Sequence, residues 1–296
     1  MVSIYKNKLQ KQGFTVKATL QIGLDEKDRL LLESIRSYFG GVGNITKLGK
    51  DTIQYRVSST KDLKVIIDHF IKYPTFGCFI YIYMSVRTHR TLITQKQADF
   101  ELFKQIVEML SRKEHLTREG PRQAADLRAS INDGLSDELK LAFPDTKQVS
   151  RPNVKFEGIP DPNWVSGFVS AEGCFLVNIF TAGTVNTGFY VQLKFQLTQH
   201  SRDQVLIRYL KDYFGCGRLI EPADYNHLDY VVTKFSDLTD KILPFFGKYS
   251  LGGSKVLEFL DFCKVIEIVK NKGHLTESGL KEIRFIKAGM NRGRST

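Results

Sequence analysis

Hydrophobic and polar residues alternate in two parts of the chain, and this alternation predicts β-strands. Apolar side chains occupy every second position near the N-terminus and again after residue 176. They are Val2, Ile4, Val16, Leu20 and Ile22 in the first part, and Val177, Ile179, Val191, Leu193, Phe195 and Leu197 in the second. Further strands are predicted at 54–57 and 229–232. Because successive side chains of a strand point to opposite faces, each part should form a sheet with one apolar and one polar face.

Apolar residues at helical spacing predict helices after the strands. Hydrophobic residues three and four positions apart occur in the segments 27–39, 62–73, 95–112 and 255–270. Ser59 or Thr60 should cap the second of these helices, because a side-chain hydroxyl can accept a hydrogen bond from a free N–H group of the first turn. Strands followed by helices in each half predict an α+β fold.

The two parts are copies of one unit. Gly13, Phe14 and Val16 recur 175 positions later as Gly188, Phe189 and Val191. The same spacing relates Asp28 to Asp203, Tyr38 to Tyr213, Tyr55 to Tyr230, and Asp62 to Asp237. From Lys96 onward the spacing is 159, which relates Lys96 to Lys255, Phe100 to Phe259, His115 to His274, and Asn132 to Asn291. Such a duplication predicts two similar units about a pseudo-twofold axis.

The repeat sets the expected domain boundaries. We expect a first unit over residues 1–145, a linker over 146–162 and a second unit over 163–296. The change of spacing indicates about sixteen extra residues in the first unit, near 75–91. We interpret them as an insertion or surface loop rather than a membrane-touching or partner-binding element.

Composition points toward a polyanionic partner. The formal net charge is +11 and the isoelectric point is about 9.4, and clustered Lys and Arg displace counterions from phosphates. The polar strand faces carry almost no Asp or Glu, which suits contacts with base edges and phosphates, although simple solvation is the alternative. The residues expected to contact DNA are Ser3, Tyr5, Thr15, Lys17, Thr19, Gln21, Gln54 and Arg56, and then Asn178, Tyr190, Gln192, Lys194, Gln196, Arg218 and Thr233.

Other classes of protein fit the sequence less well. Four scattered cysteines, with no paired spacing, argue against a zinc site or a disulfide framework. The longest apolar run, 76–84, is about half the length of a membrane span. We therefore expect a soluble protein with no membrane partner, and we find no signal peptide or presequence at the N-terminus.

One segment carries the candidate chemistry. Residues 164–175 form a short apolar stretch in which a carboxylate and a glycine, Glu172 and Gly173, follow the small residues Ser166 and Ser170. The small residues would let another helix approach closely. A carboxylate at the foot of such a helix, beside the polar sheet face, suits a hard divalent cation. An ordinary charge at a helix end is the alternative interpretation.

These features together resemble the LAGLIDADG homing endonucleases, specifically the two-repeat, single-chain enzymes encoded in fungal mitochondrial introns. The resemblance rests on the segment 164–175, the strand Phe-Leu-Val-Asn-Ile that continues from it, the strand Phe-Gln-Leu-Thr-Gln-His, and the repeated His-Leu-Thr. It covers almost the full length. It implies two αββαββα repeats with saddle-shaped antiparallel sheets that lie in the major groove of DNA. The first repeat should lack its N-terminal helix, because the counterpart of 164–172 would lie upstream of Met1.

The resemblance also implies a reaction and its residues. It implies double-strand cleavage of a long, imperfectly symmetric DNA site by metal-assisted hydrolysis, with Mg2+ as cofactor, in a monomeric mitochondrial protein. Glu172 would bind the metal, with the Ala171 carbonyl as a further ligand. Gln199, Lys255 and Lys96 would organise solvent around the scissile phosphate, although solvated helix lysines are the alternative for the last two.

The missing first motif leaves three explanations open. The reading frame continues upstream of Met1, the copy is decayed, or the protein binds nucleic acid without cutting it; we favour the first. The rival function is therefore a non-cleaving nucleic-acid-binding protein, either an RNA maturase for its own intron or a remnant DNA binder.

Overall fold

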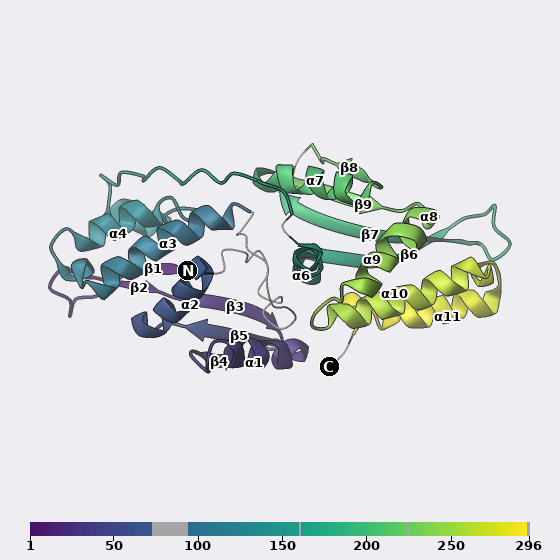
Figure 1. Ribbon diagram of the computed structural model, residues 1–296, viewed down its shortest axis with the longest axis horizontal. Helices are drawn as coiled ribbons and strands as arrows, with labels where there is room; N and C mark the ends of the chain where they lie inside the picture. The colour runs from purple at the N-terminus through teal and green to yellow at the C-terminus, as the bar shows by residue number, and fades with distance from the viewer. Residues whose placement is uncertain (73–93, 160, 224, 295–296) are drawn as a thin grey trace. The chain divides into compact units, whose positions relative to one another are not determined.

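The computed structural model describes residues 1–72, 94–159, 161–223 and 225–294 (Figure 1). These residues form two compact units: Unit 1 ends at residue 159, and Unit 2 begins at Asp161. The predicted insertion near 75–91 lies outside the described residues. Within the described ranges, no helix is long and apolar enough to cross a bilayer.

Unit 1 begins with a β-hairpin. Strands β1 (Val2–Lys6) and β2 (Phe14–Ala18) are antiparallel, with Ile4 opposite Val16. The alternate residues Val2, Ile4, Val16 and Ala18 are buried, which confirms the predicted alternation. Helices α3 (Lys96–Ser111) and α4 (Gly120–Arg128) pack on the hairpin (Figure 1), and a short helix α5 (Asp137–Ala142) follows.

A three-stranded antiparallel sheet completes Unit 1. Its order is β3 (Leu20–Asp25), β5 (Thr52–Val57) and β4 (Asn44–Lys47). Helix α1 (Arg29–Tyr38) packs on β3 and β5 through its buried residues Leu32 and Ile35. Helix α2 (Thr60–Lys72) begins after Ser59, whose hydroxyl accepts a hydrogen bond from the Asp62 N–H at 3.4 Å. The predicted cap is thereby confirmed.

Unit 2 contains one four-stranded antiparallel sheet. Its order is β6 (Gly173–Thr181), β7 (Phe189–His200), β9 (His227–Val232) and β8 (Arg218–Ile220). Helix α6 (Pro162–Glu172) leads directly into β6, and α7 (Gln204–Phe214) packs on β7 and β9. Phe175 and Phe195, on neighbouring strands, are fully buried with ring centroids 5.3 Å apart.

Helices follow the sheet of Unit 2. An irregular helical stretch comprises α8 (Phe235–Asp237), a π-helical turn (Leu238–Ile242) and α9 (Leu243–Lys248). Two longer helices, α10 (Lys255–Lys270) and α11 (Glu277–Ala288), pack against each other, and α10 also packs on β6 (Figure 1). The mixed helices and antiparallel sheets confirm the predicted α+β class.

The sequence repeat is reproduced element by element. Strands β5 and β9 cover residues that are 175 apart, and helices α3 and α10 cover residues that are 159 apart, each over 16 residues. Two non-glycine residues with positive φ occur in each unit at equivalent positions. They are Lys113 (60°) and Lys272 (58°), and Asn132 (49°) and Asn291 (53°). Duplication has therefore preserved unusual backbone conformations as well as the regular elements.

The segment after α5 packs on Unit 1. The Lys147 N–H donates to the Asp126 carboxylate at 2.7 Å, and Arg151 Nη1 donates to Asp99 Oδ1 at the same distance. This segment was expected to begin a linker at residue 146. The division between the units at residue 160 lies near the end of that expected linker.

Candidate functional site

Helix α6 places Glu172 at its exposed end. The helix is capped by Asp161, whose side chain accepts a hydrogen bond from the Asn163 N–H at 2.7 Å. Residues 164–170 are all buried, whereas Ala171 and Glu172 are exposed. The last turn of a helix carries partial negative charge on its carbonyls and attracts cations. The acid predicted to bind metal is therefore accessible, at the end of a buried helix.

Small polar residues fix α6 to the segment before α10. Ser166 Oγ donates to the Tyr249 carbonyl at 2.7 Å. Ser170 Oγ donates to the Ser166 carbonyl at 2.6 Å and accepts from the Gly252 N–H at 2.9 Å. The sequence predicted that these small residues admit a neighbouring helix; within Unit 2 their hydroxyls bind 249–252. Because Lys255 starts α10 three residues later, these bonds help to set its place relative to α6.

Lys255 lies close to the start of β6. Burial raises the pKa of the Cys174 thiol, whereas the positive charges of Lys255 and Lys194 act in the opposite direction. Cys174 is two residues beyond Glu172, so both lysines lie within electrostatic range of the strand that begins at the candidate metal ligand. Cationic groups near this carboxylate suit a site at which negative charge develops on a phosphate.

Lys96, the Unit 1 counterpart of Lys255, is held by its own unit. Its ammonium donates to Asn132 Oδ1 at 3.0 Å and lies 3.8 Å from Asp99 Oδ2. The side chain is 60% exposed, so its hydrogen bond leaves it accessible to a ligand. Lys96 is thus both exposed and hydrogen-bonded within its own unit, and its role at a phosphate stays a prediction.

Gln199 lies on the opposite side of β7 from the residues expected to contact DNA. It shares its side of the strand with the buried Leu197 and is paired with the buried Leu228. Gln196, by contrast, is on the outward side, where its amide donates to Thr198 Oγ1 at 3.1 Å. The structure thus does not bring Gln199 onto the outward face.

The outward face of the Unit 2 sheet gathers the residues predicted to contact DNA in this unit. Asn178 of β6 lies opposite Gln192 of β7, and Tyr190 is 51% exposed. The remaining predicted residues of the strands on this face are Lys194, Gln196 and Arg218, and Thr233 directly follows β9. Among the outward strand positions one acid occurs, Asp229, which accepts a hydrogen bond from Thr198 at 2.5 Å.

The outward face of Unit 1 is divided between two sheets. On the hairpin, Ser3 lies opposite Lys17 and Tyr5 lies opposite Thr15. The Lys17 ammonium is 5.4 Å from the centre of the Tyr5 ring. On the three-stranded sheet, Gln21 and Arg56 are paired on neighbouring strands.

Two residues expected on this outward face are buried, and the structure corrects that expectation. Thr19 is 2% exposed, because it lies between β2 and β3 and its N–H and carbonyl both bond to Met1, at 2.8 and 2.6 Å. Gln54 is 8% exposed, and its amide donates to Thr46 Oγ1 of the adjacent strand at 3.1 Å. Alternation alone reveals neither a break between strands nor a cross-strand partner.

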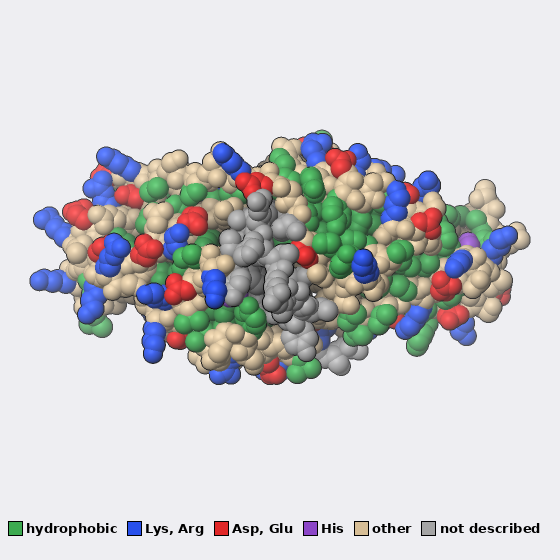
Figure 2. Space-filling model, viewed as in Figure 1, with side chains coloured by type: hydrophobic (Ala, Val, Ile, Leu, Met, Phe, Trp, Pro, Cys, Tyr) green, Lys and Arg blue, Asp and Glu red, His purple; other side chains and the backbone are tan. Residues whose placement is uncertain are grey.

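Charge is mixed over the helices. Figure 2 shows Lys and Arg side chains interspersed with Asp and Glu over the helical surfaces of both units. Several form close ion pairs, such as Lys104 with Glu101 at 2.6 Å and Lys264 with Asp261 at 2.8 Å. Such pairs offer little net charge to a polyanion. The acid-poor sheet faces are therefore better suited to a phosphate backbone than the helices are.

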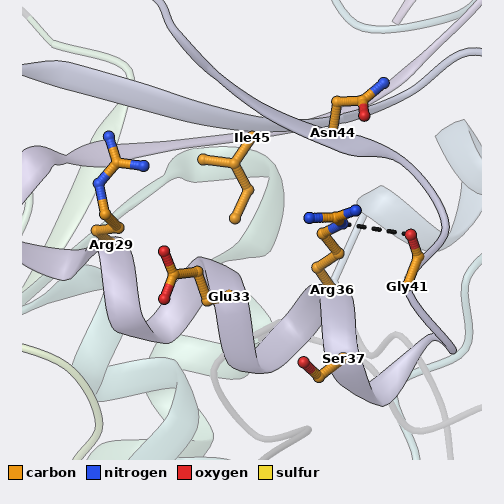
Figure 3. Close-up of a pocket in the computed structure, with 7 residues that line it drawn as sticks. All are labelled: Arg29, Glu33, Arg36, Ser37, Gly41, Asn44 and Ile45. Carbon is orange, nitrogen blue, oxygen red and sulfur yellow. Dashed lines mark hydrogen bonds between the residues drawn. The ribbon is translucent and has the colours of Figure 1, made fainter.

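A shallow pocket of about 440 Å³ lies between α1 and β4. Figure 3 shows Arg29, Glu33 and Arg36 on one side of α1, next to Ile45 of β4. Both arginines have partners within Unit 1. Arg36 Nε donates to the Gly41 carbonyl at 3.2 Å, and Arg29 pairs with Glu26. With Glu33 between the arginines, the charge is largely balanced, and we place the candidate chemistry at α6 instead.

The donor set at α6 fits a hard cation with few protein ligands. Across the described ranges, no three His, Cys, Asp or Glu side chains come together as a metal cluster. The end of α6 offers the Glu172 carboxylate and the neighbouring Ala171 carbonyl, both oxygen donors at an exposed position. Mg2+ characteristically keeps several waters and binds one or two carboxylates together with substrate phosphates. These residues therefore fit such an ion.

Comparison with known sequences identifies the family of the chain. The sequence profile described as LAGLIDADG endonuclease matches residues 1–89 and 165–266. The chain belongs to the LAGLIDADG endonuclease family. Probable intron-encoded endonuclease 3 of Neurospora crassa is 35% identical over 287 residues, which are 96% of this chain and 50% of that protein. Probable intron-encoded endonuclease 2 of the same species is 36% identical, over 97% of this chain and 61% of that protein. The chain thus spans between 50% and 61% of these relatives.

A solved member of the LAGLIDADG family shares the whole fold. The structure of the I-SmaMI LAGLIDADG homing endonuclease bound to cleaved DNA has a TM-score of 0.90 and 42% identity. The match covers 100% of this chain and 93% of that chain. A second structure of I-SmaMI, bound to an uncleaved DNA target in the presence of calcium ions, has a TM-score of 0.88 and the same identity over 99% of this chain and 94% of that chain.

The structure also shows residues next to the site lysines that the sequence did not single out for a role. Asn132 and Asn291 recur at equivalent positions, but their left-handed backbone and their bonds become visible only in the structure. Their recurrence was the available signal, because an asparagine retained in both copies is expected where φ is positive. The acids that bind them, Asp99 and Glu258, were concealed because they lie within ordinary amphipathic helices.

Proposed function

We propose that this LAGLIDADG protein is a site-specific DNA endonuclease of the homing type. It cuts both strands of a long, imperfectly symmetric duplex site. The observation that carries the proposal is the exposed Glu172 at the end of the buried helix α6, beside an acid-poor sheet face. The DNA-bound state of I-SmaMI, which is 42% identical to this chain, supports it.

The reaction is attack of water on a phosphodiester. The water oxygen forms a bond to phosphorus and gives up a proton to solvent, the bond from phosphorus to one ester oxygen breaks, and the leaving oxygen takes up a proton from solvent. This hydrolysis is extremely slow without a catalyst, so stabilisation of the charge that develops on the phosphate is the main requirement.

Side chains near α6 supply that stabilisation. Glu172 and the Ala171 carbonyl would hold a divalent cation, for which we propose Mg2+. When bound, the cation would lower the pKa of a coordinated water and neutralise charge on the phosphate. Lys255, close to the start of β6, would stabilise the pentavalent phosphate, and Lys96 would serve the equivalent role in Unit 1. Gln199, on the other side of β7 from Gln196, stays a candidate for organising solvent.

The outward sheet faces would bind the duplex. Amide, hydroxyl and cationic side chains on strands suit hydrogen bonds to base edges in the major groove, and Lys and Arg suit phosphates. Two such faces on one chain would read two different half-sites, which makes the target asymmetric. We propose that the protein acts as a monomer, because the duplication supplies both faces. We also propose a mitochondrial location, by the family resemblance.

A cleavage assay with a matched pair of variants tests the proposal. The substrate is a plasmid carrying the intronless exon junction of the host gene, and the protein is used as this chain. We expect cleavage with Mg2+ or Mn2+, and binding without cleavage in Ca2+. Glu172→Gln should slow cleavage about 100-fold or more while leaving DNA affinity within a few fold, because a charge-stabilising ligand is lost.

The control is Glu282→Gln, which removes an exposed helical carboxylate of α11 in the same unit. It should cleave at the wild-type rate. A wild-type protein that binds the junction but never nicks it with either metal contradicts the nuclease proposal, as does undiminished cleavage by E172Q.

The second candidate function is binding without cleavage. It is motivated by the sequence, which carries one such motif, 164–172 with Glu172, whereas cleavage of both strands calls for an acid in each unit. In that case the protein would bind its own intron RNA as a maturase, or the DNA junction as a remnant endonuclease. Tight, specific binding of intron RNA with no preference for the junction DNA would favour the maturase.

A further inference from the structure

Each unit contains an asparagine in the left-handed backbone region. Asn132 has a φ of 49° and Asn291 a φ of 53°, and the two are equivalent in the repeat. Left-handed backbone is unfavourable for most side chains, but asparagine tolerates it better than most. The retention of the same residue and conformation in both units, although most of the surrounding sequence has changed, indicates a shared requirement at this position.

Each asparagine is bound through its backbone to a buried acid on the helix that carries the site lysine. The Asn132 N–H donates to Asp99 Oδ1 at 3.1 Å, and the Asn291 N–H donates to Glu258 Oε2 at 2.5 Å. Asp99 is 7% and Glu258 3% exposed. Both acids lie three residues after the lysine that begins the helix, Lys96 or Lys255. The acid therefore fixes the asparagine against the first turn of that helix.

Each buried acid also has an arginine partner, supplied by a different part of the chain. Arg151, in the segment after α5, donates to Asp99 Oδ1 at 2.7 Å. Arg294, after α11, donates through Nε to Glu258 Oε1 at 3.0 Å. The two arginines are not equivalent in the repeat. A buried carboxylate is costly unless its charge is compensated, and the two units meet that requirement by independent means.

The asparagine side chains then reach the residues of the site. In Unit 1, Asn132 Oδ1 accepts a hydrogen bond from the Lys96 ammonium at 3.0 Å. In Unit 2, Asn291 Nδ2 donates to the Phe175 carbonyl at 3.1 Å, and the Cys174 thiol donates to Asn291 Oδ1 at 3.6 Å. Both of these contacts are on β6, immediately after Glu172 and Gly173.

We propose that Asn132 and Asn291 are positioning residues for the two site lysines, an inference that rests on the proposed endonuclease function. Asn132 holds the ammonium of Lys96 directly. Asn291 joins the first turn of α10 to the start of β6, and so holds Lys255 in register with Glu172. Neither asparagine touches the substrate; each acts through the lysine of its own unit.

Glycine substitutions isolate the side chain from the backbone. Glycine adopts positive φ readily, so Asn132→Gly and Asn291→Gly should keep the bond to the buried acid and lose the side-chain contacts. The control is Lys272→Gly, which places glycine at another left-handed, exposed position of Unit 2. Thermal melting should show all three variants folded.

Cleavage by these variants gives the first readout. We expect N132G and N291G each to lower the single-turnover cleavage rate about 10- to 100-fold at unchanged DNA affinity. N132G should slow one DNA strand and N291G the other, so that nicked plasmid accumulates, whereas K272G cleaves as wild type. Combining N132G with Lys96→Ala should be no slower than K96A alone, because residues that act as a unit are not additive.

Alkylation of Cys174 gives a second readout that needs no cleavage. The rate at which iodoacetamide modifies Cys174 is measured by mass spectrometry. We expect N291G to raise this rate several fold and K272G to leave it unchanged. A wild type that does not cut would refute the nuclease while alkylation still tests the hold of Asn291 on β6. If the wild type cuts, two results would refute the positioning role. One is that both glycine variants cut at the wild-type rate, and the other is that their effects multiply with those of the lysine substitutions. Unchanged alkylation in N291G would refute it for Unit 2.

Discussion

The two units differ in their sheets and agree in the helices that carry the site lysines. In Unit 2, β7 runs without a break over Phe189–His200, whereas the equivalent span of Unit 1 is divided at Thr19 into β2 and β3. Unit 2 therefore has one four-stranded sheet, and Unit 1 has two smaller ones. Helices α3 and α10, by contrast, begin and end at equivalent residues. The outward strand surface has diverged while the helices that begin at Lys96 and Lys255 have been kept.

This contrast fits a protein that reads two unlike half-sites with one chemistry. The position of Thr19 in Unit 1 is taken by Lys194 in Unit 2, so a buried residue in one unit corresponds to an outward cation in the other. The lysines at the helix starts, the left-handed asparagines and the buried acids are held in common. The two units thus differ at this strand position and agree at the lysines and asparagines.

The largest effect on the comparison should come from two equivalent glycines in the first turns of α4 and α11. A Cβ at Gly120 would lie 2.2 Å from the Glu114 carbonyl oxygen, and a Cβ at Gly279 would lie 2.2 Å from the Gly273 carbonyl oxygen. Because backbone must shift in both cases, Gly120→Ala and Gly279→Ala should each lower the free energy of unfolding by about 2 to 3 kcal/mol. Urea denaturation of each variant measures this.

The control for those variants is Gly247→Ala in α9, where an added Cβ meets nothing within 4 Å. It should be neutral or raise the free energy of unfolding by up to about 1 kcal/mol, because alanine favours a helix over glycine. If only one of the two repeat-related glycines proved sensitive, the close packing of helix ends would not be a shared feature of the units.

The sequence predicted the regular elements well because they are set by local pattern. The predicted helix 255–270 is α10 itself, and 54–57 lies within β5. Periodicity could also have placed Gln199, since it has the same parity as the buried Leu197. The resemblance gave Gln199 a role in organising solvent, and that role stays a prediction.

Long-range contacts explain what the sequence did not predict. Arg151 lies in a segment with the composition of a linker, yet it bonds to Asp99, 52 residues earlier. Gln54 is polar on a polar face and is nevertheless buried beside Thr46. In each case a partner on another segment decides the environment, and the alternation of polar and apolar residues does not reveal that partner.

A smaller effect should distinguish two equivalent tyrosines. Tyr55 and Tyr230 are both fully buried, but Tyr55 Oη donates to the Val42 carbonyl at 3.0 Å, whereas Tyr230 Oη lies 3.6 Å from the Cys216 thiol. Tyr55→Phe should cost about 1 to 2 kcal/mol, because a buried carbonyl loses its partner. Tyr230→Phe should cost less than about 0.5 kcal/mol, since a thiol is a weak hydrogen-bonding group. Equal losses in urea denaturation would contradict this difference between the units.

The smallest effect concerns two equivalent histidines, His115 and His274, and should be the same in both units. Burial lowers the pKa of each imidazole from its ordinary value of 6.5. The folded protein therefore favours the neutral form, and below about pH 6.5 the unfolded chain takes up protons first. Stability that is present above this pH should be lost as the pH falls through the folded-state pKa of each histidine. His115→Gln and His274→Gln should each reduce that loss by a similar amount, measured by urea denaturation between about pH 7 and pH 5. Carboxylates that titrate at lower pH contribute equally to the parent and the variants. If the variant with both substitutions keeps the full pH dependence of the parent, these histidines are not the source of that pH dependence.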